Sequence, residues 1–171
     1  MSQSLPLPPV QIKRWGIIDW LGMLGMMRKF LVDNGYTFQE KGHEYKGAEA
    51  KIEWSASRNY TWFCRFDIDL YIHFRNLKHV QVVVDGEEKP MVDARMIIEI
   101  TGKLTLDYKN SFEKTKFHLF LRQVLMNYIW RKKIGGGWGD DLYYFIYRLH
   151  RETKIFLGME TPSDSSRYRI T

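Results

Sequence analysis

Apolar and polar side chains alternate along residues 61–75, and this pattern predicts one long β-strand. Its even positions are apolar and its odd positions are mostly polar or charged. Successive side chains of a strand point to opposite faces, so one face of this strand is buried and the other meets water. Residues 92–108 repeat the alternation, with Met96, Ile98 and Ile100 among the apolar even positions. The two strands predict a sheet that is covered on one face only.

Two shorter segments extend this sheet. Residues 49–57 alternate with the same parity, and residues 80–84 form a short apolar run that ends at the turn signal Asp85-Gly86. Asn76-Leu77 predicts a turn before that run. Because the connections are short, the pattern favours an antiparallel meander of four strands.

Helical periodicity appears on both sides of the strands. Residues 15–34 carry apolar side chains at steps of three and four, and Asn34-Gly35 predicts the end of this helix. Residues 36–47 predict a loop that can include a short strand. After Asn110 the sequence predicts a helix that ends near Arg131-Lys132-Lys133, then a glycine-rich connection over residues 135–139. A last helix follows, and Asp140 or Asp141 is predicted to cap it. Its predicted inner face consists of Leu142, Phe145, Ile146, Leu149 and Phe156.

These elements predict one α+β domain: a four-stranded antiparallel meander sheet with an N-terminal helix and two C-terminal helices on one face. The 171 residues are enough for a single domain with a hydrophobic core. We predict an extended N-terminal arm over residues 1–14, where Leu-Pro-Leu-Pro-Pro excludes a helix. The domain covers residues 15–159, and a polar, flexible tail follows over residues 160–171.

Cysteine usage and hydropathy predict a cytoplasmic protein. The single cysteine, Cys64, excludes an internal disulfide and lies on the apolar face of the strand over residues 61–75, which predicts a small buried side chain. Residues 17–32 are too short and too charged for a membrane span, and residues 1–10 lack the features of a secretory signal. We therefore expect no membrane partner.

Three sequence motifs, in this order of elements, resemble a group of uncharacterised archaeal proteins. The motifs are Asp85-Gly86, Phe120-Leu121-Arg122, and Leu142-Tyr143-Tyr144 followed by Tyr147-Arg148-Leu149-His150. The resemblance covers residues 50–157. It implies a cytoplasmic protein and no particular activity, cofactor or site residue.

The net charge of +6 comes from one region of this basic protein. Residues 109–154 contain ten Lys and Arg against four Asp and Glu, and the rest of the chain is balanced. Cations neutralise phosphates and exposed tyrosines stack on unpaired bases. One hypothesis is therefore non-catalytic binding of RNA, a ribonucleoprotein or another polyanion; the other is a solvated face. The predicted nucleic-acid-binding residues lie on the two C-terminal helices: Lys114, His118, Arg122, Arg131, Lys132, Lys133, Tyr147, Arg148, Arg151 and Lys154.

Two further classes of function remain open. Helix 15–34 is apolar nearly all round, which is typical of a helix that is buried or meets a partner. It favours a protein–protein interaction or self-assembling structural module, with a homodimer or larger homo-oligomer formed through this helix. The third class is a metal-dependent hydrolase on the polar sheet face, where Asp67, Asp69 and His73 could hold a divalent metal.

Other residues weaken the case for an enzyme. Four cations, Arg65, Arg75, Arg95 and Lys103, are predicted on the same sheet face, and a face of mixed charge is typically just solvated. The glycine-rich connection lacks a Gly-Lys-Ser/Thr motif, and the acids at 140 and 141 would repel a phosphate. The single cysteine faces inward, so the sequence offers no Ser/His/Asp or Cys/His arrangement for nucleophilic catalysis. We expect no catalytic residue and no cofactor.

Overall fold

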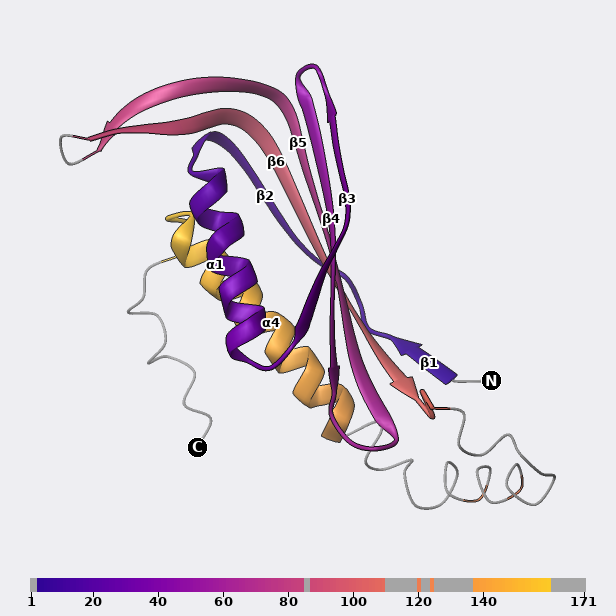
Figure 1. Ribbon diagram of the computed structural model, residues 1–171. Coiled ribbons are helices and arrows are strands. Elements are labelled where there is room, and N and C mark those ends of the chain that lie inside the picture. The colour runs from indigo at the N-terminus through magenta and orange to yellow at the C-terminus, as the bar shows by residue number, and fades with distance from the viewer. Residues whose placement is uncertain (1–2, 85–86, 110–119, 121–123, 125–136, 161–171) are drawn as a thin grey trace.

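The computed structural model describes residues 3–84, 87–109, 120, 124 and 137–160. Within these residues the chain forms one antiparallel sheet of six strands, with two helices packed on one of its faces (Figure 1). The elements in chain order are β1 Gln3–Pro6, β2 Val10–Ile18, α1 Trp20–Asp33, β3 Thr37–Lys46, β4 Glu49–Asn59, β5 Cys64–Val84, β6 Glu87–Leu106 and α4 Gly139–Phe156.

The prediction of a four-stranded meander with two C-terminal helices is wrong. The sheet has the order β1-β6-β5-β4-β3, and β2 pairs with β6 on the same side as β1. Among the described residues α4 is the one C-terminal helix with defined bounds; of the other predicted helix, which ends near Lys133, only residues 120 and 124 are described. The meander from β3 to β6 is antiparallel throughout, and the N-terminal segment supplies the other two strands.

The extended N-terminal segment pairs with the sheet as β1 and β2, and the predicted helix begins later than residue 15. β2 runs along β6 from Val10 opposite Ile100 to Ile18 opposite Val92. The helix predicted from Trp15 begins only at Trp20, because the Asp19 carboxylate accepts a hydrogen bond of 2.9 Å from the Gly22 N–H and caps the helix there. The apolar residues of β2 are compatible with both periods, which explains the error.

The central hairpin is longer than the sequence predicts. The turn predicted at Asn76-Leu77 is a β-bulge inside β5, where Asn76 has a φ of 55° and the pairing with β6 shifts between Arg75 and Lys78. The predicted loop over residues 36–47 is the edge strand β3. Its mostly exposed, charged side chains hide the alternation on which a sequence-based assignment depends.

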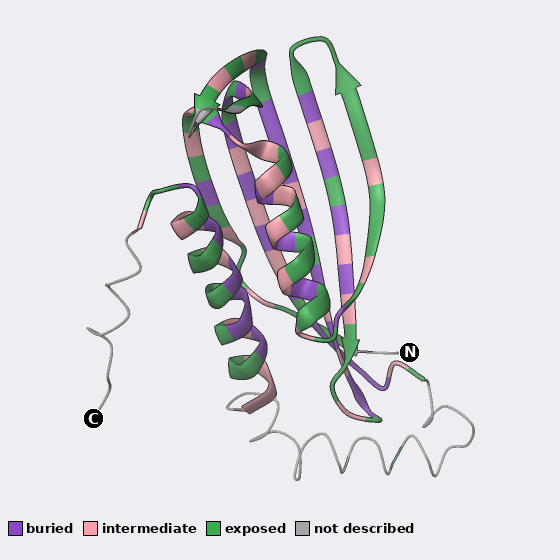
Figure 2. Cartoon of the chain, turned by 60° about the vertical axis from the view of Figure 1, so that its left-hand side comes forward, coloured by how far each residue is buried: buried purple, intermediate pink, exposed green. Residues whose placement is uncertain are grey.

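The core lies between the sheet and the two helices. Buried and exposed residues alternate along the strands, and the buried stripes of α1 and α4 face the sheet (Figure 2). The even parity is confirmed: Phe66, Ile68 and Ile100 are at most 3 % exposed. Helix α1 contributes Met23, Met27 and Leu31, and α4 contributes four of its five predicted inner residues; the fifth, Phe156, is 42 % exposed. No described helix is long and apolar enough to cross a membrane.

Apolar residues of α1 outside its buried stripe also make contacts within the chain. The Trp20 ring meets Phe74 edge-on at 5.8 Å between centroids, and Phe30 lies 5.4 Å from Phe145 of α4. Leu21 and Val32 remain exposed at 56 % and 51 %. A homo-oligomer formed through this helix stays a prediction.

Candidate nucleic-acid interface

Four of the ten predicted nucleic-acid-binding residues lie in the described part of the chain, all of them on α4. These are Tyr147, Arg148, Arg151 and Lys154. The other six lie outside the described residues: Lys114, His118, Arg122, Arg131, Lys132 and Lys133. Tyr147, Arg148 and Arg151 are exposed and Lys154 is half-buried, whereas the buried side of α4 faces the sheet.

The α4 residues do not form one cationic surface. The Arg148 guanidinium lies 5.8 Å from the Phe30 ring of α1, and Lys154 Nζ pairs with Glu160 at 3.0 Å. The Tyr147 ring stands 4.6 Å from the Tyr143 ring at a tilt of 48°. Among these cations, Arg151 alone has neither an ion pair nor a ring contact within the described residues.

The charge of α4 itself is also unfavourable for a polyanion. Residues 139–160 carry three Lys and Arg against four Asp and Glu. Burial, with Lys154 nearby, lowers the pKa of His150 and so disfavours a positive charge on this imidazole. Neither Asp140 nor Asp141 caps the helix; Asp141 instead accepts a hydrogen bond of 2.8 Å from the Tyr60 hydroxyl.

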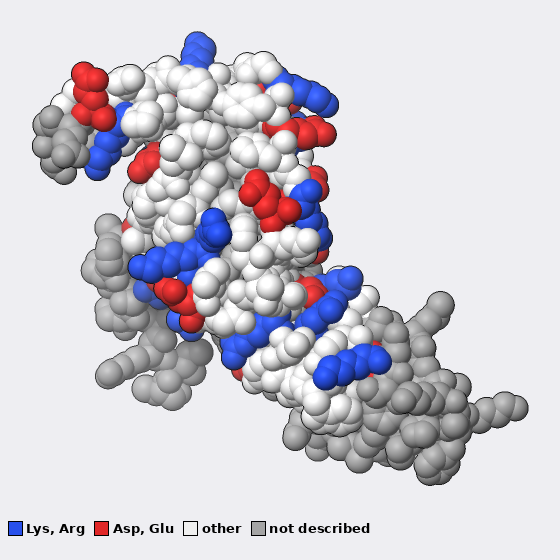
Figure 3. All heavy atoms as spheres, in the orientation of Figure 1, with Lys and Arg blue, Asp and Glu red and all other residues white. Residues whose placement is uncertain are grey.

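The positive excess of the chain lies mostly outside the described residues. The described residues carry 18 Lys and Arg against 17 Asp and Glu, a net of +1 out of the total of +6. In the orientation of Figure 1, both signs of charge are scattered over the surface with uncharged atoms between them (Figure 3). A polyanion site in the described structure therefore needs a local concentration of cations.

Such a concentration lies on the open face of the sheet, opposite the helices. The strand register aligns Lys13, Ile97, His73 and Lys51 across β2, β6, β5 and β4. The next row aligns Trp15, Arg95 and Arg75. We call Lys13, Lys51, Arg75 and Arg95, together with Trp15, the basic sheet patch.

The cations of the basic sheet patch are uncompensated. Arg75 and Arg95 are exposed and stand directly opposite each other on β5 and β6. Within the described structure none of the four cations forms an ion pair, and only Arg95 has a ring contact, with its Cζ atom 5.4 Å from the centroid of Trp15. Like charges directly opposite each other on neighbouring strands are destabilising. A bound anion would relieve that repulsion.

Two acids border the patch without neutralising it. Glu49 Oε2 lies 3.5 Å from Nε2 of His73, which is only 7 % exposed. Glu44 stands opposite Lys51 in the register but pairs with Lys46 at 3.4 Å. The two aligned rows, extended to β3, therefore hold five cations against two carboxylates.

The three candidate metal ligands do not come together. Asp67 pairs with Arg65 Nε at 2.8 Å and accepts a hydrogen bond from the Thr105 hydroxyl, whereas Asp69 pairs with Lys41 at 2.8 Å. His73 lies further along β5, beside Glu49. In the described parts of the chain, no three His, Cys, Asp or Glu side chains are grouped so that they could hold a metal ion.

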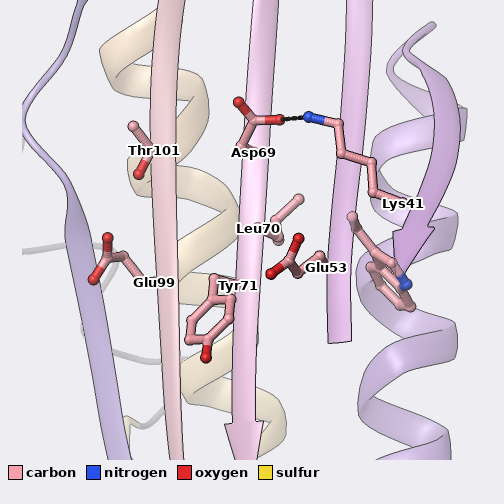
Figure 4. Close-up of a pocket in the computed structure, with 8 residues that line it drawn as sticks. Lys41, Glu53, Asp69, Leu70, Tyr71, Glu99 and Thr101 are labelled. Atoms are coloured by element: carbon pink, nitrogen blue, oxygen red, sulfur yellow. Dashed lines mark hydrogen bonds and ion pairs between the residues drawn. The ribbon is translucent and has the colours of Figure 1, made fainter. Parts of the chain in front are cut away.

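An acidic pocket adjoins the basic sheet patch. This pocket of about 220 Å³ contains Glu53, Asp69 and Glu99 beside Tyr71 and Lys41 (Figure 4). Tyr71, Glu53 and Glu99 form the cross-strand row directly next to that of His73, and Glu99 accepts a hydrogen bond of 2.8 Å from Gln11. The open face is therefore acidic beside the row of His73 and basic at the end that carries Arg75 and Arg95.

Cys64 is not a reactive thiol. It is fully buried on the core side of β5, and burial raises the pKa of the thiol to about 12. Burial therefore disfavours the nucleophilic thiolate at neutral pH. The predicted small buried side chain is confirmed.

Sequence reasoning placed Arg75 and Arg95 on the polar face but missed Lys13 and Trp15. The sequence places Lys13 in the arm and Trp15 in the long helix, so neither residue is aligned with the sheet. Alternation from Gln11 to Ile18, with Ile12 and Ile18 buried, is the signal that could have found them. Comparison of the chain with protein-family models, curated protein sequences and solved structures finds no match, so its function has to be inferred from these residues.

Proposed function

We propose that this protein is a non-catalytic nucleic-acid-binding protein, with RNA as the first candidate, and that it binds the phosphate backbone through the basic sheet patch. The observation that carries the proposal is the pair Arg75 and Arg95, directly opposed and without ion pairs among the described residues. Lysine and arginine bind nucleic acid by neutralising phosphates and releasing counterions.

The spacing of the patch suits a chain of phosphates. Directly opposed residues on neighbouring antiparallel strands have Cβ atoms about 5 Å apart, and residues two apart on one strand lie about 7 Å apart. Arg75 and Arg95 are an opposed pair, and Lys13 and Lys51 lie one row further along β2 and β4. All four cations are therefore within reach of one short stretch of the phosphate backbone of a nucleic acid.

The distribution of charge favours the sheet, rather than α4, as the phosphate-binding surface. Residues 139–160 have a net negative charge, whereas the two aligned rows of the sheet have a net positive charge. Tyr147 and Arg151 remain available as a separate contact surface on the helix side. The cationic segment with Arg131, Lys132 and Lys133 precedes α4 in the sequence and can add a further electrostatic contribution.

The test compares binding of a mixed-sequence RNA and the matching DNA over a range of salt concentrations. The double substitution Arg75→Ala with Arg95→Ala should lower the magnitude of the salt slope by about 1.4, because two phosphate contacts are lost from a single strand. Lys103→Ala is the matched control: this exposed lysine lies on the same face of β6, away from the patch. It should leave the slope nearly unchanged.

Two further variants separate the sheet from the helix. Tyr147→Ala and Arg151→Ala should change affinity less than the double arginine substitution. If they weaken binding more, the interface is on α4, and the basic sheet patch is a solvated surface. If the wild-type protein binds neither RNA nor DNA at low salt, the proposed function is wrong, and the interaction-module alternative takes its place.

A further inference from the structure

Trp15 is an exposed aromatic side chain at the edge of the open sheet face. It is 71 % exposed, the highest exposure among the large hydrophobic residues of the described structure. Its strand, β2, pairs with β6 on one side only. Large aromatic side chains are usually well buried, and an exposed one beside cations is typical of a binding surface.

The ring of Trp15 is supported from the sheet. Arg95 is the residue directly opposite on β6, and its guanidinium lies over the indole at 5.4 Å from the centroid. Such a cation–π contact holds the ring next to the positive charges of the patch. The 71 % exposure requires most of the remaining indole surface to face solvent.

The apolar surface of Trp15 continues along β2. Gly16 follows with a φ of 113°, a conformation that L side chains rarely adopt. Ile17, the next residue on the same face, is itself 51 % exposed and extends the apolar surface.

We infer that Trp15 is a base-stacking platform and that the ligand of the basic sheet patch is therefore single-stranded nucleic acid. This inference rests on the proposed function. The bases of a duplex are paired and stacked on one another, so they present a free ring face only at the ends. An unpaired nucleotide can place its base on Trp15 while its neighbouring phosphates lie toward Arg95 and Arg75. Proteins that bind single strands combine a cationic track with aromatic stacking in this way.

Stacking of this kind tolerates different sequences, because every base has a ring face. The single strand is therefore bound with little sequence preference, and the 12-mers used in the test can be of mixed sequence.

The experiment measures the affinity of the full chain for three probes of different chemistry. These are a single-stranded 12-mer of mixed sequence, the duplex of the same sequence, and inorganic polyphosphate, which offers phosphates without bases. Trp15→Ala should weaken binding of the single strand by about 5- to 100-fold while leaving the salt slope unchanged. Trp15→Phe should restore most of the affinity, because a smaller ring still stacks.

Two controls keep the result specific. Trp15→Leu retains apolar surface without a π face and should behave like the alanine variant. Trp62→Ala removes another exposed tryptophan, 61 % exposed in the turn between β4 and β5 at the far end of β5, and should leave affinity unchanged. Because Trp15 is exposed, each variant should melt within a few degrees of the wild type, which a thermal unfolding scan checks.

The two failures are distinguishable. In one outcome, the single strand, the duplex and polyphosphate bind the wild type equally well. The double substitution Arg75→Ala with Arg95→Ala weakens binding of all three, whereas Trp15→Ala changes none of them. The patch then binds phosphates, and the stacking inference is wrong. If none of the three probes binds the wild type at low salt, the proposed function itself is wrong. A preference for the single strand that disappears in Trp15→Ala and returns in Trp15→Phe supports both.

Discussion

Gly102 shows how one residue sets the distance between two elements. It lies on the core face of β6, where a Cβ atom would collide with Cδ1 of Ile146 on α4. Ile146 is itself only 1 % exposed, so it has little room to move away. Glycine inside a strand usually weakens it, and here the close approach of a helix explains its presence.

We therefore predict that Gly102→Ala destabilises the fold by about 1–3 kcal/mol, the usual cost of overpacking a core. Denaturant unfolding of the two proteins measures this difference. Gly42→Ala in the exposed strand β3 is the matched control, because an added Cβ there meets nothing within 4 Å. A stability loss at Gly42 equal to that at Gly102 would show that backbone freedom, and not packing, sets the effect.

At the scale of elements, alternation is predictive only where one face of a strand is buried. β4 and the first half of β5 lie inside the sheet, and the parity of their apolar residues predicted their buried faces correctly. β3 is an edge strand with charges on both faces, so it carries no clear period. β2 alternates weakly, and its apolar residues also fit a helical period. Their place in the sheet depends on pairing with β4 and β6, which sequence periodicity does not contain.

The start of α1 depends on a single side chain that periodicity also does not reveal. Asp19 follows β2 and caps α1 through the Gly22 N–H. We predict that Asp19→Ala lowers the free energy of unfolding by about 0.5–2 kcal/mol, the usual contribution of an N-cap. Asp19→Asn should retain most of the stability. Asp33→Ala at the other end of α1 serves as control in chemical denaturation, since removal of an acid near a helix C-terminus should be neutral or slightly stabilising.

At the scale of the whole molecule, the sheet separates two surfaces with different roles. One face is buried by α1 and α4 and holds the core, and the other is open and polar (Figures 1 and 2). The sequence predicts this division from parity alone. It does not predict which cations gather on the open face, because that depends on the register that aligns β2, β6, β5 and β4. The candidate site is thus a product of pairing between segments far apart in the chain.

The opposed arginines test whether the open face is organised for binding at the expense of stability. Arg75→Glu would replace a repulsive cross-strand pair with an attractive one facing Arg95, while leaving the Arg95–Trp15 contact in place. Because the site is exposed, the gain should be small, about 0.2–1 kcal/mol in the free energy of unfolding. The same substitution places a carboxylate where a phosphate should bind, so affinity for the single-stranded 12-mer should fall below that of Arg75→Ala. Stabilising substitutions at functional sites commonly reduce function in this way.

Lys103→Glu provides the comparison on the same face: it should leave affinity nearly unchanged. Denaturant unfolding and binding titrations of the same preparations measure both effects. A variant that is more stable and still binds like the wild type would mean that Arg75 has no part in recognition.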